Sequence, residues 1–280
     1  MSNKEIKIIE TSVFKILKNK EAREYIRVNQ PFKSLEMYIA LIKGKATIKV
    51  NEKTEIAGDS SILLLWKYPT IEITDLAEDA ELRLILIPTE MILQQEFFLD
   101  YTFVYSMYKR PCFLTNKKMI NEFIRFYDFI ATQQTVSNAV DQDQLNKQLS
   151  YALFLKLKSL YISQDLMVTP DYNSEENTLA DKFQILLFQE MWNEPELSFY
   201  ANKLQVSSEE LTAAIEKEWG DTAQNWILIL RTNQIILSLR QNSLSLENIA
   251  QKFSFQSVAD LETEFRKQTG KEVSAFRAQS

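Results

Sequence analysis

The pattern of apolar and polar positions divides the chain into a β-rich first part and a helical remainder. In "KATIKVNEKTEI", apolar and polar residues alternate over 45–50, which is the period of a half-buried strand. "SSILLLW", "IEIT" and "ELRLILIP" follow as short apolar runs, and turns are predicted at "NEK", 51–53, and at "AGD", 57–59. Many short strands at this spacing predict a small antiparallel barrel or jelly roll over residues 1–110.

From about residue 115 onward the period becomes helical. "NKKMINEFIRFYDFIA" and "QDQLNKQLSYALFLKLKSLYI" each place apolar residues on one broad face, which predicts two long amphipathic helices within 111–163. Either these helices pack on the barrel and on each other, or part of their apolar stripe is a dimer interface. The polar, acidic segment 164–177, which contains Pro170, is predicted to be a linker, and residues 178–280 are predicted to be helical.

The C-terminal part contains an internal repeat of a helix-turn-helix unit. The first copy is "LSFYANKLQVSSEELTAAIEKEWG", 197–220, and the second is "LSLENIAQKFSFQSVADLETEFRKQTG", 244–270. Each copy has a small residue before the turn, Ala201 or Ala250, and each ends with a glycine suited to a left-handed helix stop. Between the copies, "TAQNWILILRTNQIILSLRQ" predicts one continuous helix that would fix their separation.

"FYANKLQVSSEELTAAIEKEWGDTAQNWI" and the second copy extended to "KEVSAFR" resemble the AraC/XylS-type DNA-binding domain of bacterial transcription regulators. "YIALIKGKATIKVNEKTEIAGDSSILLLWKYPTIEI" is similar to the cupin-like sensor barrels of many members. The resemblance implies an α+β chain with a cupin-like sensor barrel over 1–110, dimerisation or packing helices over 111–163, the linker 164–177, and a double helix-turn-helix domain over 178–280. It also implies two reading helices in successive major grooves, which lie about 34 Å apart.

The charge of the predicted reading helices departs from that of a typical DNA-binding surface. Residues 176–280 carry ten Lys and Arg against fifteen Asp and Glu, in a chain whose net charge is -6. Where family members usually have Gly-Phe this chain has Ser254–Phe255, and Ala259 and Asp260 replace frequent contact residues. Since Lys and Arg supply most of the attraction to phosphates, two interpretations stay open. One is a regulator that binds DNA through both units, and the other is a degenerate member that senses an effector or binds a protein with little DNA affinity.

The exposed polar positions of the two predicted reading helices are the candidate DNA contacts. Arg231, on the predicted connecting helix, is a candidate for a phosphate contact or for an interdomain contact. For an effector, Tyr38 and Trp66 are candidates by residue type, with core packing as the alternative. The remaining candidate DNA contacts are Ser207, Ser208, Thr212, Lys217, Gln256, Ser257, Thr263 and Lys267.

Composition argues against an enzyme. The chain has no histidine and a single cysteine, Cys112, so it lacks an imidazole base and the commonest nitrogen ligand for metals. No Gly-rich phosphate loop or Cys-x-x-Cys motif occurs, and we expect neither cofactor nor metal. No apolar run has the length of a signal peptide or membrane span, and one cysteine suits a reducing compartment, so we expect a cytoplasmic protein without a membrane partner. Promoter DNA is the expected partner, and a small-molecule effector, a second copy of the chain and RNA polymerase are further candidates.

Overall fold

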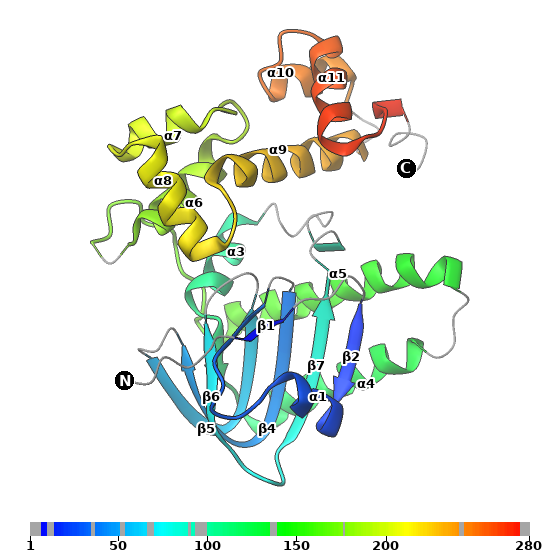
Figure 1. Ribbon diagram of the computed structural model, residues 1–280. Helices are drawn as coiled ribbons and strands as arrows, with labels where there is room; N and C mark the ends of the chain where they lie inside the picture. The colour runs from blue at the N-terminus through cyan, green and yellow to red at the C-terminus, as the bar shows by residue number, and fades with distance from the viewer. Residues whose placement is uncertain are drawn as a thin grey trace. The chain divides into compact units, whose positions relative to one another are not determined.

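The computed structural model describes residues 7–9, 14–34, 37–50, 54–65, 70–88, 91–92, 100–134, 139–175, 177–240 and 244–274. The chain forms two compact units, one made of 1–92 and 97–169 and the other of 93–96 and 170–280 (Figure 1). Each unit is described by itself below.

The N-terminal unit is built on an eight-stranded sheet (Figure 1). The hydrogen-bonded order is β1-β3-β6-β4-β5-β8, and β7 pairs with both β4 and β2. All described pairs are antiparallel except β1 with β3. The strands are β1 (Lys7–Ile9), β2 (Lys15–Lys18), β3 (Phe32–Ser34), β4 (Met37–Val50), β5 (Thr54–Leu65), β6 (Ile71–Leu76), β7 (Glu81–Ile87) and β8 (Cys112–Leu114).

Strand β4 is bent and belongs to two half-sheets. Residues 37–43 pair with β7, residues 46–50 pair with β6, and β5 runs along both parts. Between the two parts lies Gly44 with a φ of 118°, a conformation that favours glycine. A side chain there would also collide with the neighbouring turn, because an added Cβ would lie 2.8 Å from the Cα of Ala80. The β4–β5 hairpin therefore passes from one half-sheet to the other at this glycine.

The described strands form an open sheet rather than the closed barrel predicted from the sequence. Their hydrogen-bonded path ends at β1 and β8, with β2 at the end of the branch through β7. Both end strands are only three residues long, so they offer little backbone with which to complete a ring. The two half-sheets nevertheless share one core. It includes Ile26, Tyr38, Ala40, Ile42, Ile48, Leu63, Leu65, Ile71, Ile73, Leu82, Leu84 and Leu86.

The turn predicted at "AGD", 57–59, is wrong, because β5 continues through these residues. Gly58 pairs with Ala46, and an added Cβ on Gly58 would lie 2.7 Å from a methyl carbon of Leu114 in β8. The glycine is therefore a packing requirement within a strand and not a turn signal. The other predicted turn, 51–53, lies outside the described residues.

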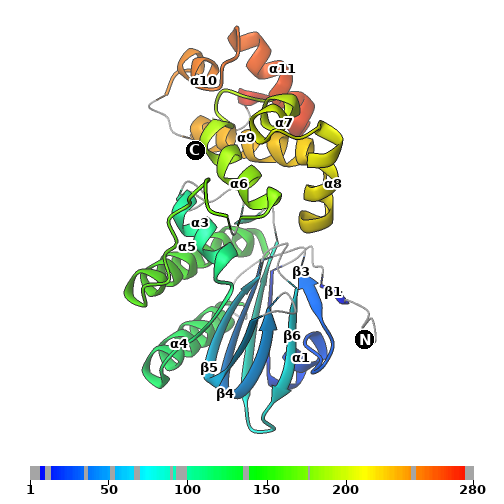
Figure 2. The same cartoon turned by 90° about the vertical axis from the view of Figure 1, so that its left-hand side faces the viewer.

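Two long helices follow the sheet, as the sequence predicts. They run antiparallel and side by side (Figure 2), with Lys156 Nζ 3.7 Å from Glu122 Oε2 and Gln134 Nε2 donating to Asn146 Oδ1 at 2.7 Å. Their buried faces match the predicted apolar stripes, for example Phe123 and Leu157. The helices of this unit for which the structure gives both ends are α1 (Asn19–Tyr25), α3 (Tyr101–Lys109), α4 (Lys117–Gln133) and α5 (Ala139–Ser163).

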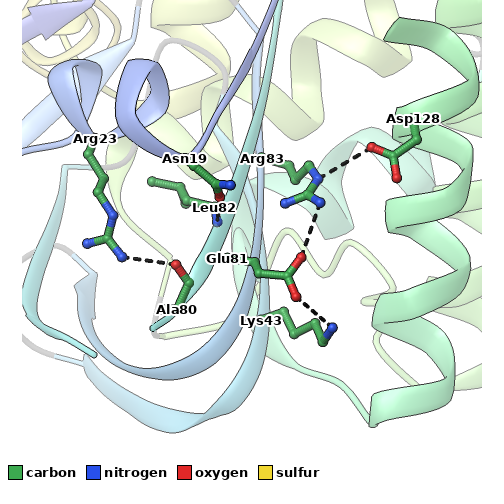
Figure 3. A network of polar contacts seen from close by, with 8 residues as sticks. All are labelled: Asn19, Arg23, Lys43, Ala80, Glu81, Leu82, Arg83 and Asp128. Carbon is green, nitrogen blue, oxygen red and sulfur yellow. Dashed lines mark hydrogen bonds and ion pairs between the residues drawn. The ribbon is translucent and has the colours of Figure 1, made fainter. Parts of the chain in front are cut away.

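A charged network links α4 to strands β4 and β7 (Figure 3). Glu81 accepts from Lys43 Nζ at 2.7 Å and from Arg83 at 3.1 Å, and the Arg83 Nε lies 3.5 Å from the Asp128 carboxylate of α4. The hydrogen bond from Lys43 and the two positive charges lower the pKa of Glu81 below its usual value. The network therefore connects α4 to the sheet through charged side chains.

The C-terminal unit is helical throughout its described part. The helix predicted between the two repeats is confirmed as α9 (Ala223–Arg240), which joins the two helix-turn-helix units (Figure 1). The predicted glycine stops are confirmed as well, with φ of 71° at Gly220 and 68° at Gly270. No helix in the described ranges is both long and apolar enough to cross a membrane. The remaining helices are α6 (Leu179–Glu190), α7 (Leu197–Leu204), α8 (Ser208–Trp219), α10 (Leu246–Lys252) and α11 (Val258–Thr269).

Candidate nucleic-acid interface

The two helix-turn-helix units are α7–α8 and α10–α11. Their small residues, Ala201 and Ala250, are buried at 3% and 4% exposure, so each first helix can approach the second closely. Each second helix is anchored by buried apolar residues one turn apart: Leu211 with Ile215 in α8, and Leu261 with Phe265 in α11. The opposite faces of α8 and α11 remain exposed, which is what a helix that enters a DNA groove requires.

Both reading helices begin with a serine cap. Ser207 Oγ accepts a hydrogen bond from the Glu210 backbone N–H at 3.0 Å, and Ser257 Oγ accepts one from the Asp260 N–H at 3.1 Å. Ser257 Oγ also donates to the Asp260 carboxylate at 2.8 Å. Carboxylates in a first turn interact favourably with the helix dipole. Part of the acidity of these helices therefore has a structural reason that is independent of DNA.

The structure exposes most of the side chains predicted to contact DNA. Ser208 and Thr212 are half-buried at the start and on the flank of α8. The exposed candidates are Ser207, Lys217, Gln256, Ser257, Thr263 and Lys267.

Arg231 is an exception, because it is only 5% exposed. Its guanidinium donates to the Met191 carbonyl and, at 2.9 Å, to the Phe253 carbonyl, and it lies 5.8 Å from the ring centres of Phe253 and Phe255. Burial lowers the pKa of Arg231 from its ordinary value. A phosphate contact, one of the two roles expected for Arg231, is therefore wrong. The other role, a contact within the protein, is observed, and it lies between the two helix-turn-helix units.

A cleft of about 510 Å³ lies between α9, α11 and the segment before α7. Three of the predicted DNA contacts line it: Arg231, Thr263 and Lys267. Three carboxylates line the same cleft: Glu196, Asp260 and Glu264. A phosphate that approaches the second reading helix along this side therefore meets carboxylates as well as a lysine.

Ion pairs further reduce the positive charge available on α11. Lys267 Nζ lies 3.7 Å from the Glu264 carboxylate, which also accepts from Gln268 at 2.8 Å. Arg266 is 3.1 Å from Glu272. These pairs are exposed and can rearrange when a phosphate approaches, since surface pairs contribute only about 0–1 kcal/mol.

Ser254 stands where members of the family that the sequence resembles usually have glycine, and its backbone conformation makes this difference matter. It adopts a φ of 57°, in the left-handed region where the family's glycine is unstrained and a serine is not. Gln205 occupies the corresponding turn of the first unit with a φ of 58°. Both turns therefore contain a side chain in a conformation that glycine would adopt more easily.

The effector candidates gain no support as pocket residues. Tyr38 lies in β4 with 0% exposure, within the core between the half-sheets, and burial raises the pKa of its hydroxyl well above the usual range. Trp66 lies outside the described residues. Cys112 is a buried thiol of β8, and burial raises its pKa to about 12, so it is not a nucleophile at neutral pH.

Two capped reading helices joined by one continuous helix define a DNA-binding domain of two helix-turn-helix units. The sequence model of the family described as "Helix-turn-helix domain" matches residues 200–279. The chain therefore contains a helix-turn-helix domain of this family within its C-terminal unit.

Among solved structures, the chain is similar to ToxT from Vibrio cholerae. An apo variant of ToxT is 14% identical, covers 97% of this chain and 99% of its own, and has a TM-score of 0.37. ToxT bound to (E)-4-(8-methylnaphthalen-1-yl)but-3-enoic acid is 13% identical, covers 95% of this chain and 98% of its own, and has a TM-score of 0.38. No curated protein matches the chain.

Proposed function

We propose that this protein is a cytoplasmic regulator that couples a sensing N-terminal unit to promoter DNA. The observation that supports the proposal is the pair of exposed, capped reading helices, α8 and α11, joined through the single helix α9. In this proposal, residues 1–110 sense the effector, residues 111–163 pack and form the dimer, and residues 178–280 bind DNA. A small-molecule effector and RNA polymerase are the further proposed partners.

The proposed readout uses polar side chains more than cations. Hydroxyls and amides can donate to or accept from base edges, and a carboxylate can accept from the amino group of cytosine. Lys217 and Lys267, both exposed near the helix ends, are the proposed phosphate contacts. The proposed base and backbone contacts are Ser207, Ser208, Thr212, Gln256, Ser257 and Thr263.

The direct test is selection of bound duplexes from a randomised library, followed by fluorescence-anisotropy titration at two salt concentrations. We expect a duplex that binds with an affinity that falls as salt rises, with a modest slope because few cations face the DNA. Lys217→Gln should reduce that slope by about 0.9. The matched control, Lys118→Gln, removes an equal charge from an exposed position of α4 and should leave the slope unchanged.

The alternative function predicts a different result. If the chain is a degenerate member that binds a protein or an effector, no duplex is enriched even at low salt. The selection then returns unrelated sequences, and neither lysine variant changes any affinity. This outcome would remove DNA binding from the proposed function.

The proposed homodimer uses the outer face of α5. Leu155 and Ile162 lie two turns apart on this face with 49% and 59% exposure, and Phe129 of the neighbouring helix α4 is 50% exposed. Exposed apolar residues gathered on one face are typical of protein interfaces. Analytical ultracentrifugation should show a dimer that dissociates in Leu155→Glu, whereas Gln148→Glu on the same stripe changes the charge but removes no apolar contact. A monomeric wild-type chain would refute this part of the proposal.

A further inference from the structure

The contacts of Arg231 belong to a joint between the two helix-turn-helix units. One side of the joint is the segment 191–193, which follows α6 and leads into α7. The other side is the segment 252–254, the end of α10 and the turn before α11. Arg231 extends from the middle of α9 between the two segments. We call these seven residues the joint.

Hydrogen bonds cross the joint in two places. Arg231 donates to the Met191 carbonyl on one side and, at 2.9 Å, to the Phe253 carbonyl on the other. Ser254 Oγ donates to the Asn193 side-chain oxygen at 3.2 Å. Both sets connect residues 22 or more positions apart, so they act between units and not within a helix.

Aromatic contacts reinforce the same joint. The rings of Trp192 and Phe253 are 5.3 Å apart, and Lys252 Nζ lies 4.5 Å from the centre of the Trp192 ring. Partial burial lowers the pKa of Lys252 from its ordinary value.

The segment 191–193 moves with the first unit because the chain continues directly into α7. Tyr200 of α7 donates to the Glu194 carbonyl at 2.8 Å, and the Leu197 N–H donates to Gln224 at 3.1 Å, so the residues directly after this segment are tied to α7 and to the start of α9. A helix such as α9 fixes the distance between two units along its axis. The joint adds what a helix alone does not provide, a fixed rotation and tilt of the second unit against the first.

We propose that the joint sets the half-site spacing that the two reading helices accept, with Arg231 as its central positioning residue. This inference rests on the proposed DNA-binding function. If α8 and α11 are held as one body, only operators whose half-sites match their separation can engage both. A loosened joint spreads the orientations of α11, so the affinity for the matched spacing falls in proportion to the fraction of molecules that remain correctly oriented.

The test uses the full-length chain and a duplex selected with the wild type. A series of duplexes is made in which the spacing between half-sites differs by one or two base pairs, together with a duplex whose second half-site is scrambled. For the wild type we expect the affinity to fall steeply on either side of the selected spacing. Arg231→Met should bind the selected duplex about tenfold more weakly, if about one molecule in ten keeps the orientation. It should bind the scrambled duplex as the wild type does.

Two milder variants keep the test decisive if Arg231→Met fails to fold. Asn193→Ala and Ser254→Gly each remove the exposed hydrogen bond across the joint, and each should lower affinity for the selected duplex about threefold and flatten the spacing profile. Ser254→Gly also relieves the left-handed conformation at this position, so its thermal midpoint should rise while its spacing discrimination falls. A residue with only a structural role cannot produce these opposite changes.

The matched control is Arg240→Met, which removes an arginine from the exposed end of the same helix and leaves the joint intact. Its spacing profile should equal that of the wild type. The proposal is overturned if Asn193→Ala and Ser254→Gly fold, bind the selected duplex and keep the wild-type profile. A wild type that binds no duplex refutes the proposed function instead, so the two failures are distinguishable.

Discussion

Replacing Gln205 with glycine should raise the free energy of unfolding of the protein. It ends α7 with a φ of 58° and an exposed side chain, and its backbone N–H donates to the Asn202 carbonyl at 3.1 Å. Gln205→Gly keeps this backbone hydrogen bond and removes only the Cβ that makes the left-handed conformation unfavourable. The substitution therefore isolates the conformational cost of the turn.

The magnitude follows from two opposing effects. A residue with a Cβ loses about 1–2 kcal/mol in the left-handed region, and glycine loses about 0.5–1 kcal/mol through its greater freedom in the unfolded chain. The net expectation is a gain of about 0.5–1 kcal/mol in the free energy of unfolding. For a unit of this size that gain raises the thermal midpoint by about 2–4 °C.

Urea unfolding followed by tryptophan fluorescence suits the measurement. Trp192, Trp219 and Trp226 lie in the C-terminal unit, so three of the four tryptophans report on the unit that contains the substitution. Gln205→Ala is the control, because alanine retains the Cβ and should leave the midpoint nearly unchanged. A midpoint that falls in Gln205→Gly, or rises equally in both variants, would refute the assignment of strain to this turn.

Three further predictions follow from local geometry. Ser207→Ala should lower the free energy of unfolding by about 1 kcal/mol through loss of the α8 cap, measured by urea titration, and an unchanged midpoint would contradict the capping role. Cys112 should resist a thiol reagent until the protein unfolds, because it is buried and its pKa is raised to about 12, and rapid labelling of the native chain would contradict this. Lys43 lowers the pKa of Glu81, so the native state binds fewer protons than the unfolded state and loses stability as pH falls. In Lys43→Met the urea midpoint should therefore decline less steeply between about pH 5 and pH 3, and a steeper decline would count against the contact.

The features that the sequence predicted well are those that depend on neighbouring residues. The small residues Ala201 and Ala250 and the glycine stops Gly220 and Gly270 are each defined within one or two turns of helix. These signals placed both helix-turn-helix units and the connecting helix correctly.

The features that the sequence predicted poorly depend on residues far away in the chain. Gly58 is of a residue type that is common in turns. Its place within a strand is explained only by the close approach of Leu114. Arg231 is of a residue type that often contacts phosphates. Its burial is explained only by the Met191 and Phe253 carbonyls that accept its hydrogen bonds. Closure of the sheet into a barrel also depends on pairing between strands that are distant in the chain, and no local sequence pattern encodes that pairing.

The burial of α9 limits how the spacing of the two reading helices could change during evolution. Eleven of its eighteen residues are buried, and Arg231 must reach both sides of the joint from one position on its surface. Inserting a single codon within this helix would turn everything after it by about 100° and shift it by about 1.5 Å. Such an insertion would separate Arg231 from at least one partner and move α11 away from its groove. Descendants of this gene should therefore keep the length of α9 constant, and adaptation to new promoters should occur in the DNA or on the outer faces of α8 and α11.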